Sequence, residues 1–252
     1  MKQKQPAVFS VASYNIHQCV GLDGRLDIKR IARVLSDLNT QLIGLQEVST
    51  HLQGAGPLSQ MEYLAEATGL HAIAGTTIER QIGPYGNVLL TGWRVLGSRL
   101  LDLSVPGREP RGAIDAELDI AGQNVRVIVT HLGLRAAERR YQVRRLLEAL
   151  SEGQHHFIMV LGDINEWILR SRPLRWFHAR FGKPPAPRTF PSWLPLFALD
   201  RVWVSPREAL LDIRTHATAL TRIASDHLPV RAIIAVEPQT PQGKQALFLP
   251  SD

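Results

Sequence analysis

The sequence lacks the features that mark disulfide-bonded, membrane-spanning or exported proteins. Among its 252 residues Cys19 is the single cysteine, which excludes an internal disulfide bond. No apolar run approaches the ~18 residues that a membrane-spanning helix needs. The basic N-terminus is followed by neither a long apolar segment nor a small-residue cleavage site, which a secretory leader would have. We therefore expect a cytoplasmic protein without a transmembrane segment, with a membrane-peripheral location left open.

The composition is that of an ordinary globular protein, but its charge is uneven. Hydrophobic residues make up 44% and charged residues 21% of the chain, which is long enough for one large or two small domains. The net charge of +6 falls entirely in the second half, because residues 1–126 hold 12 basic and 12 acidic side chains and residues 127–252 hold 17 and 11. Residues 135–188 hold 11 basic against 5 acidic side chains, and most of the basic ones are arginine. This excess indicates an anionic substrate or surface, although a solvated helix face would carry the same residues.

The segment VLGDINEW, residues 160–167, is typical of a buried strand that ends in a polar site. Asp163 and Asn165 are two residues apart, so in extended backbone both side chains point to the same side. A carboxylate and an amide placed together can hold a hard cation, or a phosphoryl oxygen and the water that attacks it. Asp and Asn after Gly162 are equally typical of a turn, so the segment alone leaves both interpretations open.

Similar polar groups recur at other predicted strand ends. Short apolar runs alternate with helical patterns, and a hairpin turn at residues 121–124 joins two strands, which together predict an α/β sandwich with mixed sheets. Eight polar residues lie at the strand ends: Asn15, Glu47, His131, Asp163, Asn165, Asp200, Asp226 and His227. Each can be a simple structural residue, but together, without cysteine ligands, they predict one oxygen-rich site.

The segment from residue 167 to residue 203 differs in composition from the rest of the chain. It contains eight of the sixteen aromatic residues and six prolines, which predict a long ordered loop without long regular structure. Both of its ends adjoin the predicted site, at Asn165 and Asp200, so we expect the loop on the substrate side. Exposure of Trp176 and Phe177 would favour binding to bases or to a membrane, and their burial would favour a lid over a small pocket. A hydrophobic cluster beneath a long loop would have the same composition.

The strand-end motifs form a recognisable series. They are SYNIH, LQEV, GNVLL, THLGL, GDINEW, LDRVWV and SDHLPV, and they span about residues 8–236. Together they resemble the endonuclease/exonuclease/phosphatase superfamily, which includes pancreatic-type deoxyribonucleases, abasic-site endonucleases, inositol-phosphate 5-phosphatases and neutral sphingomyelinases. The resemblance implies a four-layer α/β sandwich, two packed mixed β-sheets flanked by helices, over residues 8–236. Residues 1–7 would be an N-terminal extension, and residues 237–252, with their proline, glutamine and glycine, a disordered tail.

The resemblance also implies a role for each matching residue. Three would hold Mg²⁺ or Mn²⁺, the first as principal ligand: Glu47, Asn15 and Asp226. Five would act in catalysis: His131, Asp163, Asn165, Asp200 and His227. Three more are assigned to the substrate: Asn87, Arg111 and His17. In this scheme Asp163 and Asn165 orient the attacking water and the phosphate. His131 contacts the phosphate, and His227 pairs with Asp200 in a hydrogen-bonded dyad.

Some features depart from the better-known branches. His17 stands where abasic-site endonucleases carry an acid, and the inserted loops with which those enzymes grip a kinked duplex are missing. The segments NIHQCVGLDGRLDIKRIARVL, REPRG and RTFPSWLPLFALDRV instead resemble a poorly characterised bacterial branch.

We therefore expect a monomeric, Mg²⁺- or Mn²⁺-dependent hydrolase that cleaves phosphodiester bonds, either in nucleic acid or in an anionic phospholipid headgroup. One alternative is a small-molecule phosphomonoesterase, and another is a non-catalytic binding module on the same fold. A binding module would have lost at least one of the residues required for chemistry. None of these is lost: Glu47, Asp163, Asn165 and His227.

Overall fold

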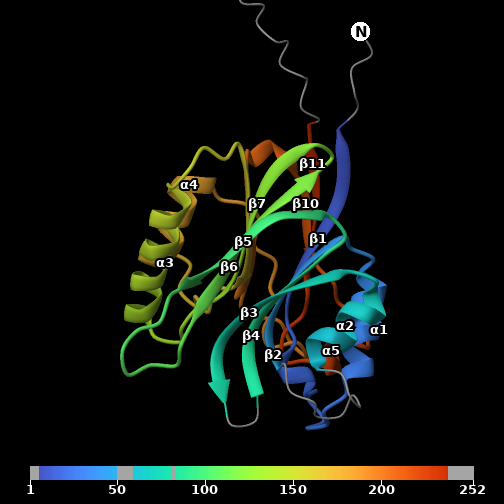
Figure 1. Ribbon diagram of the computed structural model, residues 1–252. Helices are drawn as coiled ribbons and strands as arrows, with labels where there is room; N and C mark the ends of the chain where they lie inside the picture. The colour runs from blue at the N-terminus through green and yellow to red at the C-terminus, as the bar shows by residue number, and fades with distance from the viewer. Residues whose placement is uncertain (1–5, 50–58, 81–82, 238–252) are drawn as a thin grey trace, which may run out of the picture.

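A computed structural model of the chain describes residues 6–49, 59–80 and 83–237. Two sheets pack face to face in it, with helices on the outer face of each (Figure 1). The expected four-layer α/β sandwich is confirmed. The first strand begins at Ala7 and the last ends at Val236, and the expected tail lies outside the described residues apart from Glu237. The division into extension, domain and tail stays a prediction. None of the described helices is long and apolar enough to cross a membrane.

The first sheet is built around one parallel strand pair. Its strands, in spatial order, are β10 (Leu210–Thr215), β11 (Val230–Val236), β1 (Ala7–Asn15), β2 (Leu42–Ser49), β4 (Gly83–Thr91) and β3 (His71–Arg80). β1 and β2 are parallel, and the other neighbours are antiparallel. Since layers cover both faces of β1 and β2, most of their residues are buried, which explains why these strands appear in the sequence as nearly continuous apolar runs.

The second sheet repeats this plan. Its strands, in spatial order, are β5 (Arg94–Asp102), β6 (Gly112–Ile120), β7 (Gln123–His131), β8 (Phe157–Asp163) and β9 (Asp200–Ser205). β7 and β8 are parallel, and the remaining pairs are antiparallel. The expected hairpin joins β6 to β7 through Ala121 and Gly122, whose φ angles of 55° and 83° suit a tight two-residue turn.

The main hydrophobic core lies between the two sheets. Side chains alternate along the strands, so that Val11 of β1 contacts this core while Tyr14 packs on the helical side. At Gly44 the sheets approach closely, because a Cβ atom there would lie 3.0 Å from Val129 and 3.3 Å from Leu161. This close approach holds the ends of β2, β7 and β8 next to one another, where the polar residues lie.

Helices cover the outer faces of both sheets (Figure 1). The longer ones are α1 (Ile28–Leu38), α2 (Gln60–Thr68), α3 (Ala136–Leu150) and α4 (Arg172–Phe181), and the short ones are α5 (Thr221–Ala224) and the 3₁₀ turns η1 (His17–Cys19) and η2 (Arg207–Ala209). Asp27 caps α1, and Ser59 forms a capping box with Glu62 at the start of α2. These side chains satisfy backbone N–H groups that the first helical turn leaves unpaired.

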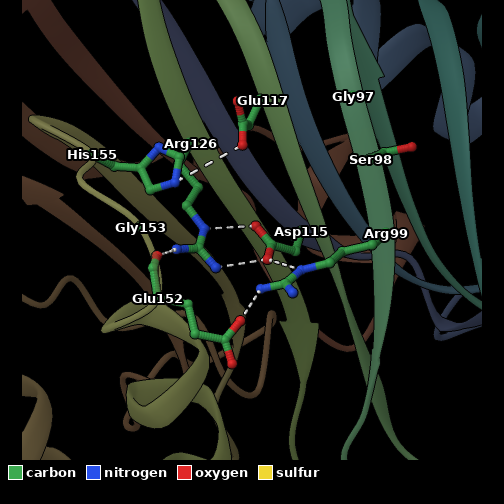
Figure 2. A pocket seen from close by; sticks show the side chains of 9 residues that line it. All are labelled: Gly97, Ser98, Arg99, Asp115, Glu117, Arg126, Glu152, Gly153 and His155. Atoms are coloured by element: carbon green, nitrogen blue, oxygen red, sulfur yellow. Dashed lines mark hydrogen bonds and ion pairs between the residues drawn. The ribbon is translucent and has the colours of Figure 1, made fainter.

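A buried arginine attaches the end of α3 to the second sheet (Figure 2). Arg126 of β7 donates two hydrogen bonds to the Asp115 carboxylate, at 2.8 and 2.7 Å. It also donates to the carbonyl oxygens of Ala149 and Glu152, both at 2.9 Å, which lie at the C-terminal end of the helix. Arg99 donates to the same carboxylate at 2.8 Å. The cluster therefore caps α3 and fixes its position on β6 and β7.

The proline-rich segment contains a regular helix, contrary to expectation. Ser171 caps α4, and Pro173 lies in its first turn, where the missing N–H group would have no helical partner. The other prolines of the segment lie beyond Phe181, so they do not interrupt the helix. Phe177 is fully buried and Trp176 partly buried in the cluster between α3, α4 and the second sheet. Neither of these two aromatic residues is exposed, whereas Trp193 of the same segment is.

Candidate active site

The polar strand ends meet at one edge of the sandwich. On the second sheet, His131 at the end of β7 is paired with Asp163 at the end of β8, which is paired with Asp200 at the start of β9. On the first sheet, Asn15 ends β1, and Glu47 lies one residue beyond the position of β2 that pairs with Asn15. Strand register brings together the residues of each sheet, and the close approach of the two sheets at Gly44 brings the two sets together.

Asp163 is the centre of the site. Its Oδ2 atom lies 3.1 Å from Nδ2 of Asn15, which donates to it. The same oxygen lies 3.5 Å from Nε2 of His131 and 3.6 Å from Nε2 of His227. The Asn15 amide also donates to Oε1 of Glu47 at 3.1 Å, so one amide group links carboxylates from both sheets. The side chains of Asp163 and Asn15 are almost fully buried, and Glu47 is half-buried.

Two residues near Asp163 have strained backbone, and so does His17, whose φ angle is 46°. Glu47 has a φ angle of 59° and Asn165 one of 51°, a region that L-residues seldom occupy. At Glu47 the register between β2 and β4 shifts, which is the mark of a bulge that redirects a side chain. The Asn165 turn is closed by its own N–H group, which donates to Oδ1 of Asp163 at 2.9 Å. Such strain costs about 1–3 kcal/mol for each residue and is found mostly at functional sites.

His227 and Asp200 form the expected dyad. Nδ1 of His227 lies 2.8 Å from Oδ2 of Asp200, and both side chains are buried. Burial alone would lower the pKa of His227, but the charges of Asp200 and Asp163 outweigh it and raise this pKa to about 10. The Phe190 ring packs on the imidazole with its centroid 4.9 Å away. The imidazole of His227 is therefore held as a cation beside Asp163 at neutral pH.

His131 has the opposite charge state. Burial, and then the neighbouring Arg111 guanidinium, lower its pKa to about 3. Arg111 lies 3.0 Å from Nδ1 of His131 and can only donate, so Nδ1 accepts and the ring proton is on Nε2. Nε2 lies 3.5 Å from Oδ2 of Asp163, which can accept its proton, and 3.0 Å from Nδ2 of Asn165, which donates one of its two hydrogens to the Leu132 carbonyl oxygen at 2.9 Å. The site thus presents one neutral and one cationic imidazole to a single carboxylate.

Comparisons with known proteins show the family of this chain. Residues 6–166 match the family described as the PGAP2IP C-terminal nuclease-like domain. The chain belongs to the endonuclease/exonuclease/phosphatase superfamily. It is 29% identical over 255 residues to the uncharacterized protein YbhP of Escherichia coli strain K12, across 92% of this chain and 98% of YbhP.

Solved structures of the superfamily have the same fold. An endonuclease/exonuclease/phosphatase from Beutenbergia cavernae superposes with a TM-score of 0.74 at 21% identity, covering 92% of this chain and 72% of that one. A mannosyl-6-phosphatase from Bacteroides thetaiotaomicron superposes with a TM-score of 0.68 at 17% identity, covering 90% and 99%. At these identities the likeness extends to the fold, and the chemistry has to be argued from the site.

Two groups of residues in this superfamily site could hold a metal ion. Asp163, Asp200 and His227 are all buried, and one ligand atom from each lies within 4.8 Å of the others. Glu47 offers a second position at the more open side. There Nδ2 of Asn15 donates to Oε1 of Glu47 at 3.1 Å, and Oδ1 of Asn15 accepts from the His17 N–H group at 3.1 Å, so the carboxamide would have to turn before its oxygen could hold the same cation. The third residue assigned to the metal, Asp226, is half-exposed. Its carboxylate accepts a hydrogen bond from Ser225 at 3.3 Å and lies 4.0 Å from Nδ1 of His17.

The residues assigned to substrate occupy different parts of the site. Asn87 donates to the carbonyl oxygen of Gly112 at 3.0 Å and lines a small hollow together with Glu47, Arg111 and His131. His17 lies away from this hollow, on η1 beside Asp226. The roles given to all these residues stay predictions, whereas their proximity is a property of the fold.

Tyr85, which no sequence motif singles out, lines the same hollow. Tyr85 is buried and its hydroxyl is hydrogen-bonded to Glu47. Burial, and then the negative charge of Glu47, raise the pKa of Tyr85, so the phenol stays protonated and donates. A signal was present: Tyr85 is two residues before Asn87 on β4 and therefore points to the same face of the strand.

Proposed function

We propose that this chain is a Mg²⁺-dependent phosphoesterase that hydrolyses phosphodiester bonds. The observation that carries the proposal is the environment of Asp163, whose Oδ2 atom is surrounded by an amide and two imidazoles in opposite charge states. A buried carboxylate can orient and deprotonate a water molecule, and N–H groups on either side can stabilise the charge that develops on phosphoryl oxygens.

The charges of the site favour a diester over a monoester. Four carboxylates lie around it: Glu47, Asp163, Asp200 and Asp226. Two cationic side chains accompany them: Arg111 and protonated His227. A phosphodiester carries one negative charge and a monoester nearly two at neutral pH, so the diester meets less repulsion. A phosphomonoester remains the alternative that a direct comparison of model substrates decides.

Glu47 is the better candidate for the metal ligand. Mg²⁺ prefers oxygen ligands and keeps several waters, so the partly exposed carboxylate of Glu47 suits it better than a fully buried group does. In the buried group, Nδ1 of His227 already lies 2.8 Å from Asp200, and a metal would have to replace that hydrogen bond. When bound at Glu47, the cation would polarise the phosphoryl group and offset its developing charge.

The chain's own residues would then accept the proton of the water and donate hydrogen bonds to the phosphoryl group. Asp163 would accept the proton of the attacking water, with Asn165 fixing its orientation through the 2.9 Å backbone hydrogen bond. His131 would donate from Nε2 to a phosphoryl oxygen, because Arg111 holds its proton on that nitrogen. His227 would donate from its cationic ring, which Asp200 orients. These roles make the two histidines hydrogen-bond donors and Asp163 the base.

An exposed apolar surface beside the site favours a phospholipid over nucleic acid. The N–H group of Ser192 donates to the carbonyl oxygen of Asp226 at 2.7 Å, which places the next residues at the rim. These are Trp193 and Leu194, which are 62% and 49% exposed. Ile223 is also exposed, and Arg222 donates to the Trp193 carbonyl oxygen at 3.2 Å. Exposed aromatic and aliphatic side chains next to an arginine suit the headgroup region of a bilayer.

The proposal is tested by metal dependence and by a panel of substrates. EDTA should abolish hydrolysis of bis-p-nitrophenyl phosphate, and Mg²⁺ or Mn²⁺ should restore it. Glu47→Gln should raise the Mg²⁺ concentration needed for half-maximal rate without lowering the melting temperature, and Asp212→Asn, on the distant edge strand β10, is the control. p-Nitrophenyl phosphate, plasmid DNA and phosphatidylglycerol vesicles separate monoester, nucleic acid and lipid substrates. Full activity of the chelated protein, or no hydrolysis of any of these substrates, would overturn the proposal.

A further inference from the structure

A second cavity lies on the opposite side of β9 from the active site. It has a volume of about 750 Å³ and is enclosed by α4 and by the chain from residue 183 to residue 198. Apolar side chains form much of its wall, among them Trp167, Leu174, Leu196 and Phe197. A cavity of this volume is in the range of sites for drug-sized molecules. None of the residues assigned to the active site lines it.

A buried arginine without a partner lines this cavity. Side chains alternate along β9, so Val202 packs between the sheets while Arg201 and Trp203 face the α4 side. Arg201 is only 6% exposed, yet its Nε and Nη2 atoms have no hydrogen-bond partner among the described residues. An unpaired buried charge carries a large free-energy cost, and folded proteins usually satisfy such groups.

The one acid that lines the cavity, Glu166, is not hydrogen-bonded to Arg201. Glu166 instead accepts two hydrogen bonds from Arg139, at 3.1 and 3.3 Å. The contrast with Arg126 of the same sheet is direct, since the Nε, Nη1 and Nη2 atoms of Arg126 each donate to an oxygen atom (Figure 2). Burial lowers the pKa of Arg201 to about 10, with the charges of Asp200 and Glu166 opposing the shift, so the guanidinium is still charged at neutral pH.

The rest of the polar lining is also basic. Lys183, Arg188 and Arg207 are exposed at the cavity and add positive charge around it. His178 also lines the cavity. Burial, and then the charge of Arg201, lower the pKa of His178, so its imidazole is uncharged at pH 7. The cavity therefore combines a positively charged interior with apolar walls.

We propose that this cavity binds a small amphipathic anion, with its carboxylate or phosphate on Arg201 and its apolar body against the aromatic and aliphatic wall. The anionic group offsets the charge of the guanidinium from the cavity side, since Nε and Nη2 are themselves shielded from solvent. The guanidinium fork matches the two oxygens of either group, so a fatty acid and an aromatic nucleotide present the same chemistry to it. The proposal is independent of the phosphoesterase reaction, because ligand binding is measured without turnover.

The wall of the cavity also contacts the active site. The Trp167 ring packs against Phe197 and Phe190, with centroids 4.8 and 5.5 Å apart, and Phe190 packs on His227. A ligand that touches Trp167 therefore lies two rings away from His227.

Anilinonaphthalene sulfonate, an aromatic sulfonate, is the probe. Its fluorescence should rise saturably on the folded wild-type protein, and decanoate or adenosine monophosphate should displace it. Displacement by decanoate alone identifies an aliphatic carboxylate as the ligand class, and displacement by the nucleotide alone an aromatic phosphate. Absence of saturable probe binding, or displacement by neither compound, overturns the proposal.

Substitutions decide whether Arg201 is the anchor. Arg201→Met should weaken probe binding about tenfold or more, the usual effect of losing hydrogen bonds to a charged group. It should also raise the melting temperature without ligand, because an unpaired buried charge is removed. A structural arginine would instead lower the melting temperature, and either that result or unchanged probe affinity refutes the assignment.

A second variant tests the rim of the cavity without touching its interior. Lys183→Ala with Arg207→Ala should weaken probe binding several-fold and reduce its salt dependence, since both residues are exposed. Arg94→Ala removes an exposed charge on β5, outside the cavity, and serves as the matched control. Equal probe affinity in the rim variant and the control would show that the positive lining does not act on a ligand.

Discussion

Two buried polar clusters lie at opposite ends of β7, and they are built on different principles. Around Arg126, the donor nitrogens meet a carboxylate and the last carbonyl groups of α3 (Figure 2). Around His131, carboxylates outnumber the cationic side chains, and Oδ1 of Asp200 is buried with no hydrogen-bond partner among the residues described. Backbone strain occurs at Glu47 and Asn165 of the second cluster.

The Arg126 cluster is suited to stabilising the fold, and the His131 cluster is suited to chemistry. A buried charge cluster whose members are all paired tolerates no loss of a partner, so it acts as a fixed joint between helix and sheet. A cluster with excess negative charge, strained backbone and histidines in opposite charge states is costly for the folded protein by itself. It can recover part of that cost when a cation and a phosphoester bind. Substitutions in the Arg126 cluster should therefore lower the free energy of unfolding more than turnover, and substitutions in the His131 cluster should do the reverse.

The largest expected effect on stability is at Arg126. Arg126→Met leaves Asp115 with Arg99 as its one remaining arginine partner and removes the cap of α3. The free energy of unfolding should fall by about 3 kcal/mol or more, as is usual when a buried pair loses one member. Urea unfolding measures the loss, and turnover per folded molecule should stay unchanged. Arg145→Ala, which removes an exposed pair with Glu148, is the control and should change stability by less than about 0.5 kcal/mol.

Substitutions in the active-site cluster should lower turnover far more than they lower the free energy of unfolding. Asp163→Asn, His131→Ala and His227→Ala should each lower turnover at least ~10²-fold, the lower range for a positioned acid–base group. None of them should lower the free energy of unfolding as much as Arg126→Met. The double substitution at Asp200 and His227 should resemble His227→Ala alone, because the two residues act as a unit. A near wild-type rate for His227→Ala would contradict the proposed roles.

A smaller effect, visible in the pH profile, is expected at Asp200. A rate that needs protonated His227 stays level through neutral pH and falls as pH rises toward about 10, the raised pKa of this residue. The Asp200 charge is a main cause of that raised pKa, so Asp200→Asn should move the alkaline fall to lower pH. The loss in turnover at neutral pH should be milder than for His227→Ala. An unchanged alkaline limb in Asp200→Asn would show that the dyad does not set the protonation of His227.

The smallest effect is expected at Tyr85. Tyr85→Phe removes one hydrogen bond to the partly exposed Glu47, which is worth about 1.5 kcal/mol, the lower end for a bond to a charged group, and corresponds to about a tenfold change. The Mg²⁺ concentration for half-maximal rate should change by this factor, with little change in turnover at saturating Mg²⁺. Tyr63→Phe on α2 is the matched control, since it lies outside the hollow. A fall in turnover at saturating Mg²⁺ would instead place Tyr85 in the chemical step.

Part of the candidate site could be predicted from the chain alone. Asp163 and Asn165 follow an apolar strand, and His131 and Asp200 also lie at strand ends, so local pattern was enough to select them. The helix α4 was missed because its prolines were counted over the whole segment, although Pro173 lies in the first turn and the others follow Phe181. Tyr85 was missed because a single tyrosine on a strand is an ordinary core residue.

The sequence by itself determined the family, the sandwich of mixed sheets and the set of polar strand ends, since these depend on local periodicity and on motifs a few residues long. Tertiary structure decided the rest, because charge states and partners depend on neighbours that are distant in the chain. His131 and His227 have similar positions in the sequence pattern, yet their pKa values shift to about 3 and about 10. Likewise Arg126 and Arg201 both lie on strands. The packing of α3 gives Arg126 hydrogen-bond partners, whereas Arg201 faces a cavity beside α4.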